Sequence, residues 1–333
     1  MKKNKNLILL FVLFILIASF IINISIGAFD ISFSQIISTL LNPQQNMINH
    51  KVLFDIRIPR ILLGLLVGMA FGISGTMMQT LFRNPLADPS IIGVSAGASA
   101  GVVLFMMLGS FLPLMFTQGT LSYFLLPLSA FFGAIITIAA IYKLATIYNK
   151  VAVTIMLLAG IAINSLLGAL IGLFSYISTD EELRSFTFWT MGSLANAETL
   201  NIMVIFPIVI FVSFFAMNKK VELNLLLLGE EEAKNVGLNT ERLKKQIIVC
   251  VSLAIGASVA FCGIIGFVGL VVPHISRAIV GSNHKYLVPL SALLGAFILI
   301  WADAIARSII SPAELPIGII TAILGAPFFL FLL

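Results

Sequence analysis

Long runs of apolar residues recur along almost the whole of this 333-residue chain, and its polar residues lie mainly in the short stretches between them. A run of about 20 apolar residues crosses the hydrocarbon core of a bilayer when it forms an α-helix. The sequence lacks the ~10-residue alternating segments of a transmembrane barrel. We therefore expect an all-α, polytopic membrane protein in which residues 1–333 form a single transmembrane domain. The ten predicted helices are 7–28, 59–81, 93–110, 123–142, 152–177, 199–217, 246–263, 265–280, 287–308 and 316–333.

Two stretches decide the number of helices. Residues 262–269, CGIIGFVG, are apolar enough to continue one long helix, but dividing the run there gives an even number of spans, with both termini on the same side. At the start of the chain, the basic sequence MKKNKN precedes an apolar run of about 20 residues, which is longer than the core of a cleaved signal peptide. We interpret that run as a retained first span.

Composition supports a protein with little mass outside the membrane. Hydrophobic residues make up 60% of the chain and charged residues 10%, whereas ~25% of a soluble globular chain is charged. Cys250 and Cys262 stand on one predicted helix, roughly 18 Å apart at 1.5 Å per residue, which is too far for a disulfide. We predict that both are packing residues. The cysteines and histidines do not cluster with the spacing of metal ligands, so the sequence implies no fixed metal.

The positive charges predict the orientation, because Lys and Arg concentrate in cytoplasmic loops. If the N-terminus is cytoplasmic, the inner loops and ends carry fourteen basic residues and the outer side carries five. The inner set is Lys2, Lys3, Lys5, Arg83, Lys143, Lys150, Lys219, Lys220, Lys234, Arg242, Lys244, Lys245, Arg277 and Lys285, and the outer set is Lys51, Arg57, Arg60, Arg184 and Arg307. We therefore expect both termini to be cytoplasmic.

Two connecting segments differ from simple loops. Within residues 29–58, on the outer side, the stretch FDISFSQIISTLL has apolar positions that suit a short amphipathic helix at the interface. Residues 83–92, RNPLADPSII, contain two prolines and are predicted to form a rigid turn.

A third of the charge lies in one cytoplasmic segment. Residues 219–245 hold 11 of the 33 Asp, Glu, Lys and Arg residues. The acidic run after Gly229 suits the N-terminus of a short helix, Gly237 offers a stop, and Asn239 or Thr240 can cap a second helix. A helical hairpin with both signs of charge can serve as a docking surface for another protein. The alternative is that it is only a solvated connector between two spans. The chain has no Gly-x-x-x-x-Gly-Lys-Ser/Thr motif, so any ATP-hydrolysing engine would be another subunit.

Seven stretches resemble the permeases of the iron-chelate and cobalamin uptake family of ABC importers, a type II importer family. They are RIPRILLGLLVGMAFGISG (57–75), QTLFRNPLADPSIIGVSAGAS (79–99), LLAGIAINSLL (157–167), LLLLGEEEAKNVGLN (225–239), GIIGFVGLVVPHISRAIVG (263–281), WADAIAR (301–307) and AELPIGIITAILGAPFFLFLL (313–333). The resemblance implies a homodimer of ten-helix subunits in the cytoplasmic (inner) membrane of a bacterium. It also implies two ATPase subunits that hold ATP and Mg, a substrate-binding protein, and no cofactor or enzymatic activity in this chain.

The resemblance also implies roles for individual residues. The residues expected to couple to the ATPase are Gly229, Glu230, Glu231, Glu232, Ala233, Gly237 and Leu238. The residues expected at the inner gate are Asn84, Leu86, Val153 and Thr154. The residues expected to receive the binding protein are Arg57, Arg60 and Arg307. Relatives often have two hydroxyl residues where this chain has Val153 and Thr154, which weakens the gate assignment, and a tight proline turn is the alternative. Interfacial snorkelling is the alternative for Arg57 and Arg60. We expect Asp303, four residues before Arg307, to orient that arginine.

The substrate is predicted from the outer stretch STDEELRSFTFWTMGSL, residues 178–194. Its pattern looks most like haem permeases of the family, with ferric siderophores next and cobalamin behind. Arg184 could meet an anionic group of the ligand, and Phe186, Phe188 and Trp189 could contact a flat ligand at the mouth, unless they form an interfacial aromatic belt. An ion-coupled transporter would need more ionisable residues near the bilayer midplane than Asp303, and no nucleophile–base pair suggests an intramembrane enzyme.

A last candidate is the VPHISR stretch. His274 and Arg277 lie three residues apart on one predicted helix face near its cytoplasmic end. Although a lone histidine can ligate haem iron, this depth is wrong for a site that opens outward. We expect packing, or contact with the ATPase side.

Overall fold

The computed structural model describes residues 4–27, 31–41, 47–109 and 120–332. Each of the ten predicted helices coincides with a helix of the structure, within a few residues at every end except the start of α13. They are α1 (Lys5–Ser25), α4 (Ile58–Phe82), α5 (Val94–Gly109), α7 (Thr120–Ala145), α8 (Val153–Ile177), α10 (Thr199–Asn218), α13 (Thr240–Cys262), α14 (Val268–Val280), α15 (His284–Ala306) and α16 (Ile317–Leu332). The all-α, polytopic fold class is confirmed.

Not all of these helices are equally long. Among the described residues, seven helices are long and apolar enough to cross a membrane, and three shorter apolar helices lie in α5, α14 and α16. The division predicted around residues 263–269 is confirmed, because α13 ends at Cys262 and α14 begins at Val268. Gly263 and Phe267 both have positive φ angles, of 69° and 67°, so the backbone leaves the helical path at both ends of the break.

Shorter elements fill the connections. They are α2 (Phe33–Leu41), α3 (Met47–Lys51), the π-helical turn Val52–Arg57, the 3-10 turn Pro89–Ile92, strands β1 (Thr146–Ile147) and β2 (Lys150–Val151), α9 (Asp180–Thr190), α11 (Lys220–Leu228) and α12 (Glu230–Asn235). The predicted amphipathic helix corresponds to α2, and the predicted proline turn contains the 3-10 turn. The sequence did not predict α11. The second short helix expected in the charged segment is the first turn of α13, so that span begins at Thr240 rather than near residue 246.

The chain folds as two compact units. The first comprises Met1–Thr76, Ser193–Asn218 and Ile265–Leu333, and the second comprises Met77–Gly192 and Lys219–Ile264. In the first unit, α15 packs against α1 and α14. The N-terminal part of α4 approaches α15 so closely that a side chain at Gly68 would collide with the backbone of Gly295. Small residues allow helices in membranes to come this close.

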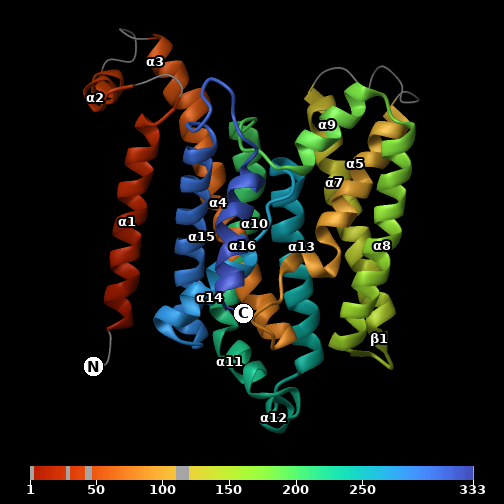
Figure 1. Ribbon diagram of the computed structural model, residues 1–333. Coiled ribbons are helices and arrows are strands. Elements are labelled where there is room, and N and C mark those ends of the chain that lie inside the picture. The colour runs from red at the N-terminus through yellow and green to blue at the C-terminus, as the bar shows by residue number, and fades with distance from the viewer. Residues whose placement is uncertain (1–3, 28–30, 42–46, 110–119, 333) are drawn as a thin grey trace. The chain divides into compact units, whose positions relative to one another are not determined.

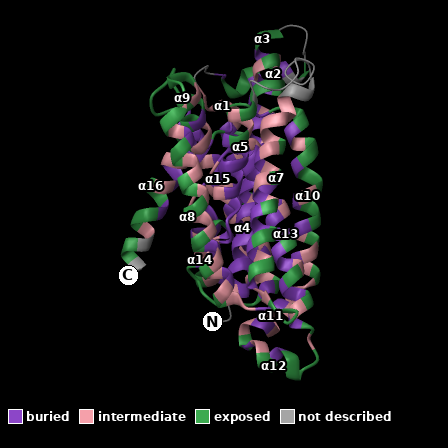
Figure 2. Cartoon of the chain, turned by 90° about the vertical axis from the view of Figure 1, so that its right-hand side faces the viewer, coloured by how far each residue is buried: buried purple, intermediate pink, exposed green. Residues whose placement is uncertain are grey.

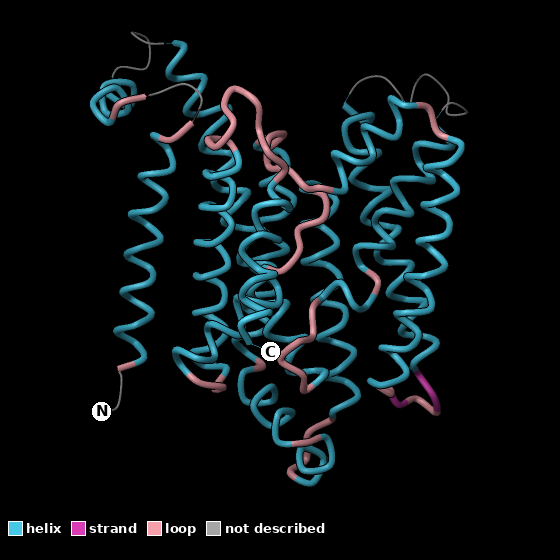
Figure 3. The backbone as a smooth tube through the Cα atoms, viewed as in Figure 1, coloured by secondary structure: helices cyan, strands magenta, loops and turns pink. Residues whose placement is uncertain are grey.

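In the second unit, α5, α7 and α8 lie side by side, and α13 packs on α7 (Figure 1). The contact between α5 and α7 again depends on glycine, since a side chain at Gly101 would meet the backbone of Ser129. A two-residue turn with positive φ at Tyr148 and Asn149 joins β1 to β2, and this small hairpin connects α7 to α8 (Figure 3).

Burial differs strongly between the helices. In Figure 2 much of α4 is buried, whereas the second half of α16 is largely exposed. Large side chains along α8, including Leu158, Ile161 and Leu166, are also exposed. Apolar side chains exposed over a whole helix need lipid or another protein chain to cover them.

Candidate functional site

The charged segment is built from two short helices separated by glycine. Helix α11 ends at Gly229, whose φ of 139° is a conformation that residues with a side chain rarely adopt. Three glutamates then form the first turn of α12, where their charge is stabilised by the helix dipole. Gly237, with a φ of 88°, ends this turn, and the side chain of Asn239 caps α13 by accepting a hydrogen bond from the backbone of Arg242. The local structure follows the sequence prediction closely.

Lys244 ties this segment to the rest of the second unit. Its side chain is fully buried, and its Nζ lies 3.0 Å from Oε1 of Glu230 in α12 and 2.7 Å from Oε1 of Glu241 in α13. The same ammonium donates a hydrogen bond of 2.8 Å to the carbonyl of Val151 in β2. The other oxygen of Glu241 accepts a hydrogen bond of 2.7 Å from the backbone N–H of Val151. We call Glu230, Glu241, Lys244 and Val151 the Lys244 cluster.

The electrostatics of the cluster favour the charged forms. Burial alone raises the pKa of Glu230, but hydrogen bonds from Lys234 and Lys244 outweigh it and lower that pKa to about 2. Lys234, four residues after Glu230 on the same helix, lies 2.7 Å from it. Glu230 is therefore ionised at every physiological pH, and the attachment of α12 to α13 does not depend on protonation near neutrality.

A polar hollow lies beside α12. It has a volume of about 460 Å³ and is lined by Arg83, Glu230, Glu231, Glu232 and Lys234. Both signs of charge face this hollow, which makes it a surface suited to a charged protein partner rather than to lipid.

Two of the predicted gate residues, Val153 and Thr154, closely follow Val151 of the Lys244 cluster in the sequence. Val153 is the first residue of α8 and is half-buried, and Thr154 is exposed. Val151, which the cluster holds on both its backbone N–H and its carbonyl, is two residues earlier. The structure therefore connects α12 to the first turn of α8 through a single buried lysine.

The other two predicted gate residues lie in the turn that follows α4. Asn84 is exposed, and its side chain accepts a hydrogen bond of 2.9 Å from the backbone of Leu86, whose side chain is 48% exposed. The turn packs on α8, because a side chain at Gly160 would collide with the carbonyl of Ile91. Leu86 is thus an exposed apolar residue on a rigid turn, and its role as a gate stays a prediction.

The three arginines predicted to receive a binding protein are buried in the first unit. Arg57, Arg60 and Arg307 expose only 3%, 6% and 5% of their surface. Arg60 makes hydrogen bonds of 2.8 and 3.0 Å to the carboxylate of Asp303 and one of 2.9 Å to Glu314. We call Arg60, Asp303, Arg307 and Glu314 the Arg60 cluster. Of these four residues, only Glu314 has a side chain with substantial exposure, 40%.

Arg57 and Arg307 also donate hydrogen bonds to backbone oxygens. Arg57 donates to the carbonyls of Ile24 and Ser25, at 2.6 and 3.0 Å. Arg307 donates to the carbonyl of Asn23 at 3.0 Å. Asp303 and Arg307 form the expected i,i+4 ion pair, with Nε of Arg307 3.7 Å from the carboxylate, but Asp303 binds Arg60 more closely and through both of its oxygens. A fork of guanidinium donors matches a carboxylate better than a single Nε does.

The residues predicted at the substrate mouth lie on α9. This helix begins with a capping box, in which Thr179 and Glu182 satisfy each other's backbone N–H groups. Arg184 is exposed and Trp189 half-buried. Phe186, which we expected at the surface, is buried against Phe174 with ring centroids 5.6 Å apart, so it cannot contact a ligand. Phe188 remains exposed.

Sequence reasoning missed one residue of each cluster. Lys244 was counted only as a positive charge, and Glu314 was not singled out. The sequence does carry a signal for an ion pair at Lys244, which stands three residues after Glu241 and beside the apolar residues Leu243 and Ile247. Both apolar residues are buried in the structure. For His274, the expectation of packing agrees with its edge-to-face contact with Phe328.

Comparisons with known proteins agree on one family. The model of the FecCD transport family matches residues 15–333. The hemin transport system permease protein HmuU of Yersinia pestis is 39% identical over 332 residues, which are 100% of this chain and 96% of that protein. The cobalamin import system permease protein BtuC of Halobacterium salinarum is 40% identical over 84% of this chain and 72% of its own.

A solved structure agrees with these sequences. It is described as an inward-facing conformation of a metal-chelate type ABC transporter, and it is 34% identical. The two chains superpose with a TM-score of 0.85 over 98% of this chain and 99% of the other.

Proposed function

This chain belongs to the FecCD transport family and is the permease of an ABC importer of that type, and from this premise we propose that it imports an iron chelate, with haem as the favoured substrate. A permease of this kind is not itself an enzyme, because the ATPase is a separate subunit. The proposed assembly is a homodimer of this chain in the cytoplasmic membrane, with two ATPase subunits that bind ATP and Mg and one substrate-binding protein. The proposed topology has both termini in the cytoplasm.

The Lys244 cluster is the observation that carries the coupling mechanism. An ATPase that moves α12 also moves Glu230, and Glu230 is held 3.0 Å from the buried ammonium of Lys244. That ammonium is bonded to Val151, two residues before α8 begins. A buried ion pair resists separation because an unpaired buried charge is costly. We therefore propose that a displacement of α12 is transmitted to the first turn of α8, where Val153 and Thr154 lie.

The proposed cycle is alternating access. A loaded binding protein docks on the outer side, and ATP closes the ATPase dimer. The polar hollow at Arg83 and Glu230–Glu232 is the proposed contact with the ATPase, and its closure draws the two α12 helices together. The first turn of α8 then shifts, and the exposed apolar residue Leu86 opens or closes the inner mouth.

The buried arginines change the proposed docking step. Arg60 already holds Glu314, and the side chain of Glu314 is partly exposed. A carboxylate of the binding protein would therefore compete with Glu314 for the Arg60 guanidinium. We propose that docking displaces Glu314 and leaves the more deeply buried pair of Arg60 and Asp303 intact.

Haem is favoured over cobalamin for two reasons. The Yersinia pestis relative named for hemin aligns over 100% of this chain, whereas the Halobacterium salinarum relative named for cobalamin aligns over 84%. In addition, α9 exposes both Arg184 and Phe188, a cation and an aromatic ring four residues apart on one helix, which suits a flat ligand with carboxylate groups. A ferric siderophore and cobalamin are the alternatives.

A growth test decides the substrate. A deletion strain is supplied with haem, a ferric siderophore or cobalamin as the sole source, with and without this permease on a plasmid. Rescue on haem alone supports the proposal. Rescue on cobalamin alone contradicts the haem assignment but leaves the importer function intact.

A second experiment tests the coupling. Replacement of Glu230, Glu231 and Glu232 together is expected to uncouple ATP hydrolysis from uptake without unfolding the permease. The control replaces Asp180 and Glu181, acidic residues at the start of α9, a helix outside the coupling segment. If uptake by the triple variant in proteoliposomes equals that of the unaltered protein, α12 is not the coupling element.

A further inference from the structure

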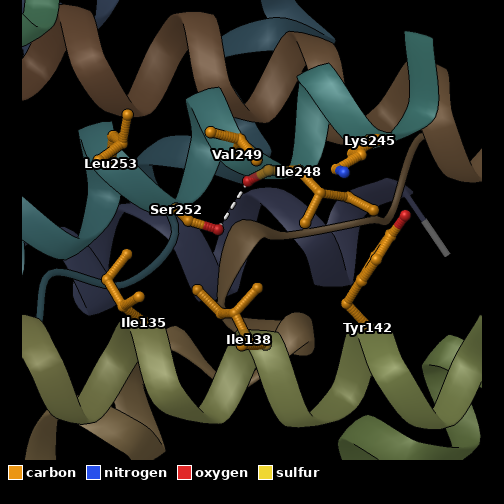
Figure 4. A pocket seen from close by; sticks show the side chains of 9 residues that line it. Ile135, Ile138, Tyr142, Lys245, Ile248, Val249, Ser252 and Leu253 are labelled. Carbon is orange, nitrogen blue, oxygen red and sulfur yellow. Dashed lines mark hydrogen bonds between the residues drawn. The ribbon is translucent and has the colours of Figure 1, made fainter. Parts of the chain in front are cut away.

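A groove between α7 and α13 is not used by the proposed transport mechanism. It has a volume of about 270 Å³, and both helices contribute one face to it (Figure 4). Ile138 of α7 faces Ile248 and Val249 of α13 across the groove. Val249 is 48% exposed, so the groove opens on the surface of the second unit.

The walls of the groove offer nothing to a polar ligand. Apart from its two residues at one end, Tyr142 and Lys245, the lining has a single polar side chain, Ser252. The hydroxyl of Ser252 donates a hydrogen bond of 2.6 Å to the carbonyl of Ile248 and is therefore already satisfied. From Ile135 to Tyr142, the apolar face of α7 extends for roughly 10 Å at 1.5 Å per residue. The occupant that such a channel favours is a hydrocarbon chain.

One end of the groove is cationic. Lys245 lies in the second turn of α13 and Tyr142 in the last turn of α7, and Figure 4 shows both polar tips at the same end. Lys245 is exposed, and within the described part of the chain it is in no ion pair with a carboxylate. The nearest acid along α13, Glu241, is occupied by Lys244 and the backbone of Val151. The positive charge of Lys245, at this end of the groove, is therefore not neutralised by a carboxylate and faces solvent or lipid headgroups.

We propose that this groove binds an anionic glycerophospholipid, with one acyl chain between α7 and α13 and the phosphate at Lys245 and Tyr142. A lysine lines the apolar groove with its methylene stem and holds its ammonium at the headgroup level. We favour a lipid over a second copy of this chain because a lipid combines an anionic headgroup, which complements the charge of Lys245, with an apolar tail, which complements the lining of the groove. Anionic lipids at the cytoplasmic surface attract basic residues in this way.

The position of the site gives the lipid a consequence. Lys245 directly follows Lys244, whose cluster joins α12 to α8. An acyl chain between α7 and α13 holds these two helices together. Helix α7 ends beside β1, and α13 begins beside α12. Lipid occupancy is therefore expected to stabilise the second unit against heat, and anionic lipid more than neutral lipid.

Native mass spectrometry of the full-length, delipidated permease tests the site. Dioleoyl phosphatidylglycerol is added in one arm and dioleoyl phosphatidylcholine in the other, so that only the headgroup differs. We expect one phosphatidylglycerol to be retained at concentrations at which phosphatidylcholine is not. Lys245→Ala is expected to weaken phosphatidylglycerol binding about fivefold, the effect of one basic residue at an anionic surface.

Two further variants separate the head and the tail. Val249→Trp, at an exposed position, fills the groove but keeps Lys245, and it is expected to abolish retention of the lipid without changing the far-UV circular dichroism. Lys220→Ala, a basic residue of α11 outside the groove, is the matched control and is expected to bind lipid normally. Equal binding of both lipids, or an undiminished signal from Val249→Trp, would overturn the proposal. So would efficient cross-linking of two permease copies through Val249→Cys, because the groove would then be covered by protein.

Discussion

Each of the two units contains a buried cation held by two carboxylates, and the two clusters differ in what they connect. Arg60 binds Asp303 in α15 and Glu314 in the segment that follows α15. Lys244 binds Glu230 in α12, Glu241 in its own helix and the backbone of Val151 in β2. The first cluster joins the start of α4 to one end of α15. The second joins three elements, of which one is the proposed ATPase contact and one leads into α8.

The chemistry of the two cations matches this difference. A guanidinium is a rigid planar fork, and Arg60 uses it to hold one carboxylate through two oxygens. An ammonium is a compact charge with three donors that point in different directions, and Lys244 uses it to meet partners from three elements. We infer that the Arg60 cluster holds the end of α15 in place, whereas the proposed role of the Lys244 cluster is to transmit a displacement of α12 to α8.

The largest effect is expected at Arg60. Arg60→Ala leaves Asp303 buried without its bidentate partner, and breaking a buried pair in this way costs about 3–5 kcal/mol. The thermal midpoint of the detergent-solubilised permease should fall accordingly. Arg184→Ala, which removes an exposed arginine from α9, is the control and should leave the midpoint unchanged.

The double variant Arg60→Met with Asp303→Leu sharpens this result. It removes both charges of the Arg60–Asp303 pair and keeps apolar volume, so it is expected to recover part of the lost stability, while Arg307 loses the carboxylate of Asp303 and keeps its hydrogen bond to Asn23. If Arg60→Ala were as stable as the unaltered protein, the Arg60 cluster would not fix the end of α15.

The next effect is expected at Lys244 and differs in kind. Lys244→Met removes a buried ammonium, but Glu230 keeps its ion pair with Lys234 and Glu241 keeps its hydrogen bond from the backbone of Val151, so a loss of roughly 3 kcal/mol or less is expected. The ratio of substrate imported to ATP hydrolysed should fall much further than the stability does. Lys150→Met, at an exposed residue of β2, is the control and should leave both quantities unchanged. A Lys244→Met protein with reduced stability and an unchanged transport ratio would assign the cluster a structural role only.

A smaller effect concerns the pH dependence of the Lys244 cluster. The pKa of Glu230 is lowered from an ordinary value near 4.5 to about 2. The stabilisation from its ionised form is therefore fully present above about pH 4.5 and is lost as the pH falls toward 2. The difference in thermal midpoint between the unaltered protein and Glu230→Gln should be constant from pH 8 to pH 5 and shrink below that. A difference that already shrinks between pH 7 and pH 6 would show that Glu230 is not held by two lysines.

The smallest effects are expected at the two glycines that flank α12. Gly237→Ala meets no neighbouring atom within 4 Å, so only its positive φ opposes the change, at a cost of about 1–2 kcal/mol. Gly229→Ala would put a side chain at φ 139° and ψ 153°, a backbone region that essentially only glycine occupies, so it should be the more destabilising of the two. Parallel thermal scans measure the order, and the reverse order would contradict this account of the turn.

Much of the fold could be predicted from the sequence, because hydrophobic length is sufficient to locate helices that cross a bilayer. All ten helices were located, and the break near Gly263 and the stop at Gly237 were found from glycine and local pattern. The amphipathic helix α2 and the proline turn were found in the same way.

The contacts of the charged residues could not be predicted. Asp303 and Arg307 stand four residues apart on one helix, which suggested a pair, but Arg60 is 243 positions away and offers a better fork. Lys244 and Val151 are 93 positions apart, and only the folded chain brings them together. Local spacing describes neighbours on one helix and carries no information about partners from distant helices, and both clusters are built from such partners.

ATP-driven uptake into proteoliposomes is the measurement that tests the central claim most directly. The permease, with Lys244 or Met at that position, is reconstituted with its ATPase and binding protein, and imported haem and released phosphate are measured together. We predict that the unaltered complex accumulates haem, that the permease without the ATPase accumulates none, and that the Lys244→Met complex hydrolyses ATP while importing little. Accumulation of haem by the permease alone, or an undiminished ratio of haem to phosphate in the Lys244→Met complex, would contradict the account.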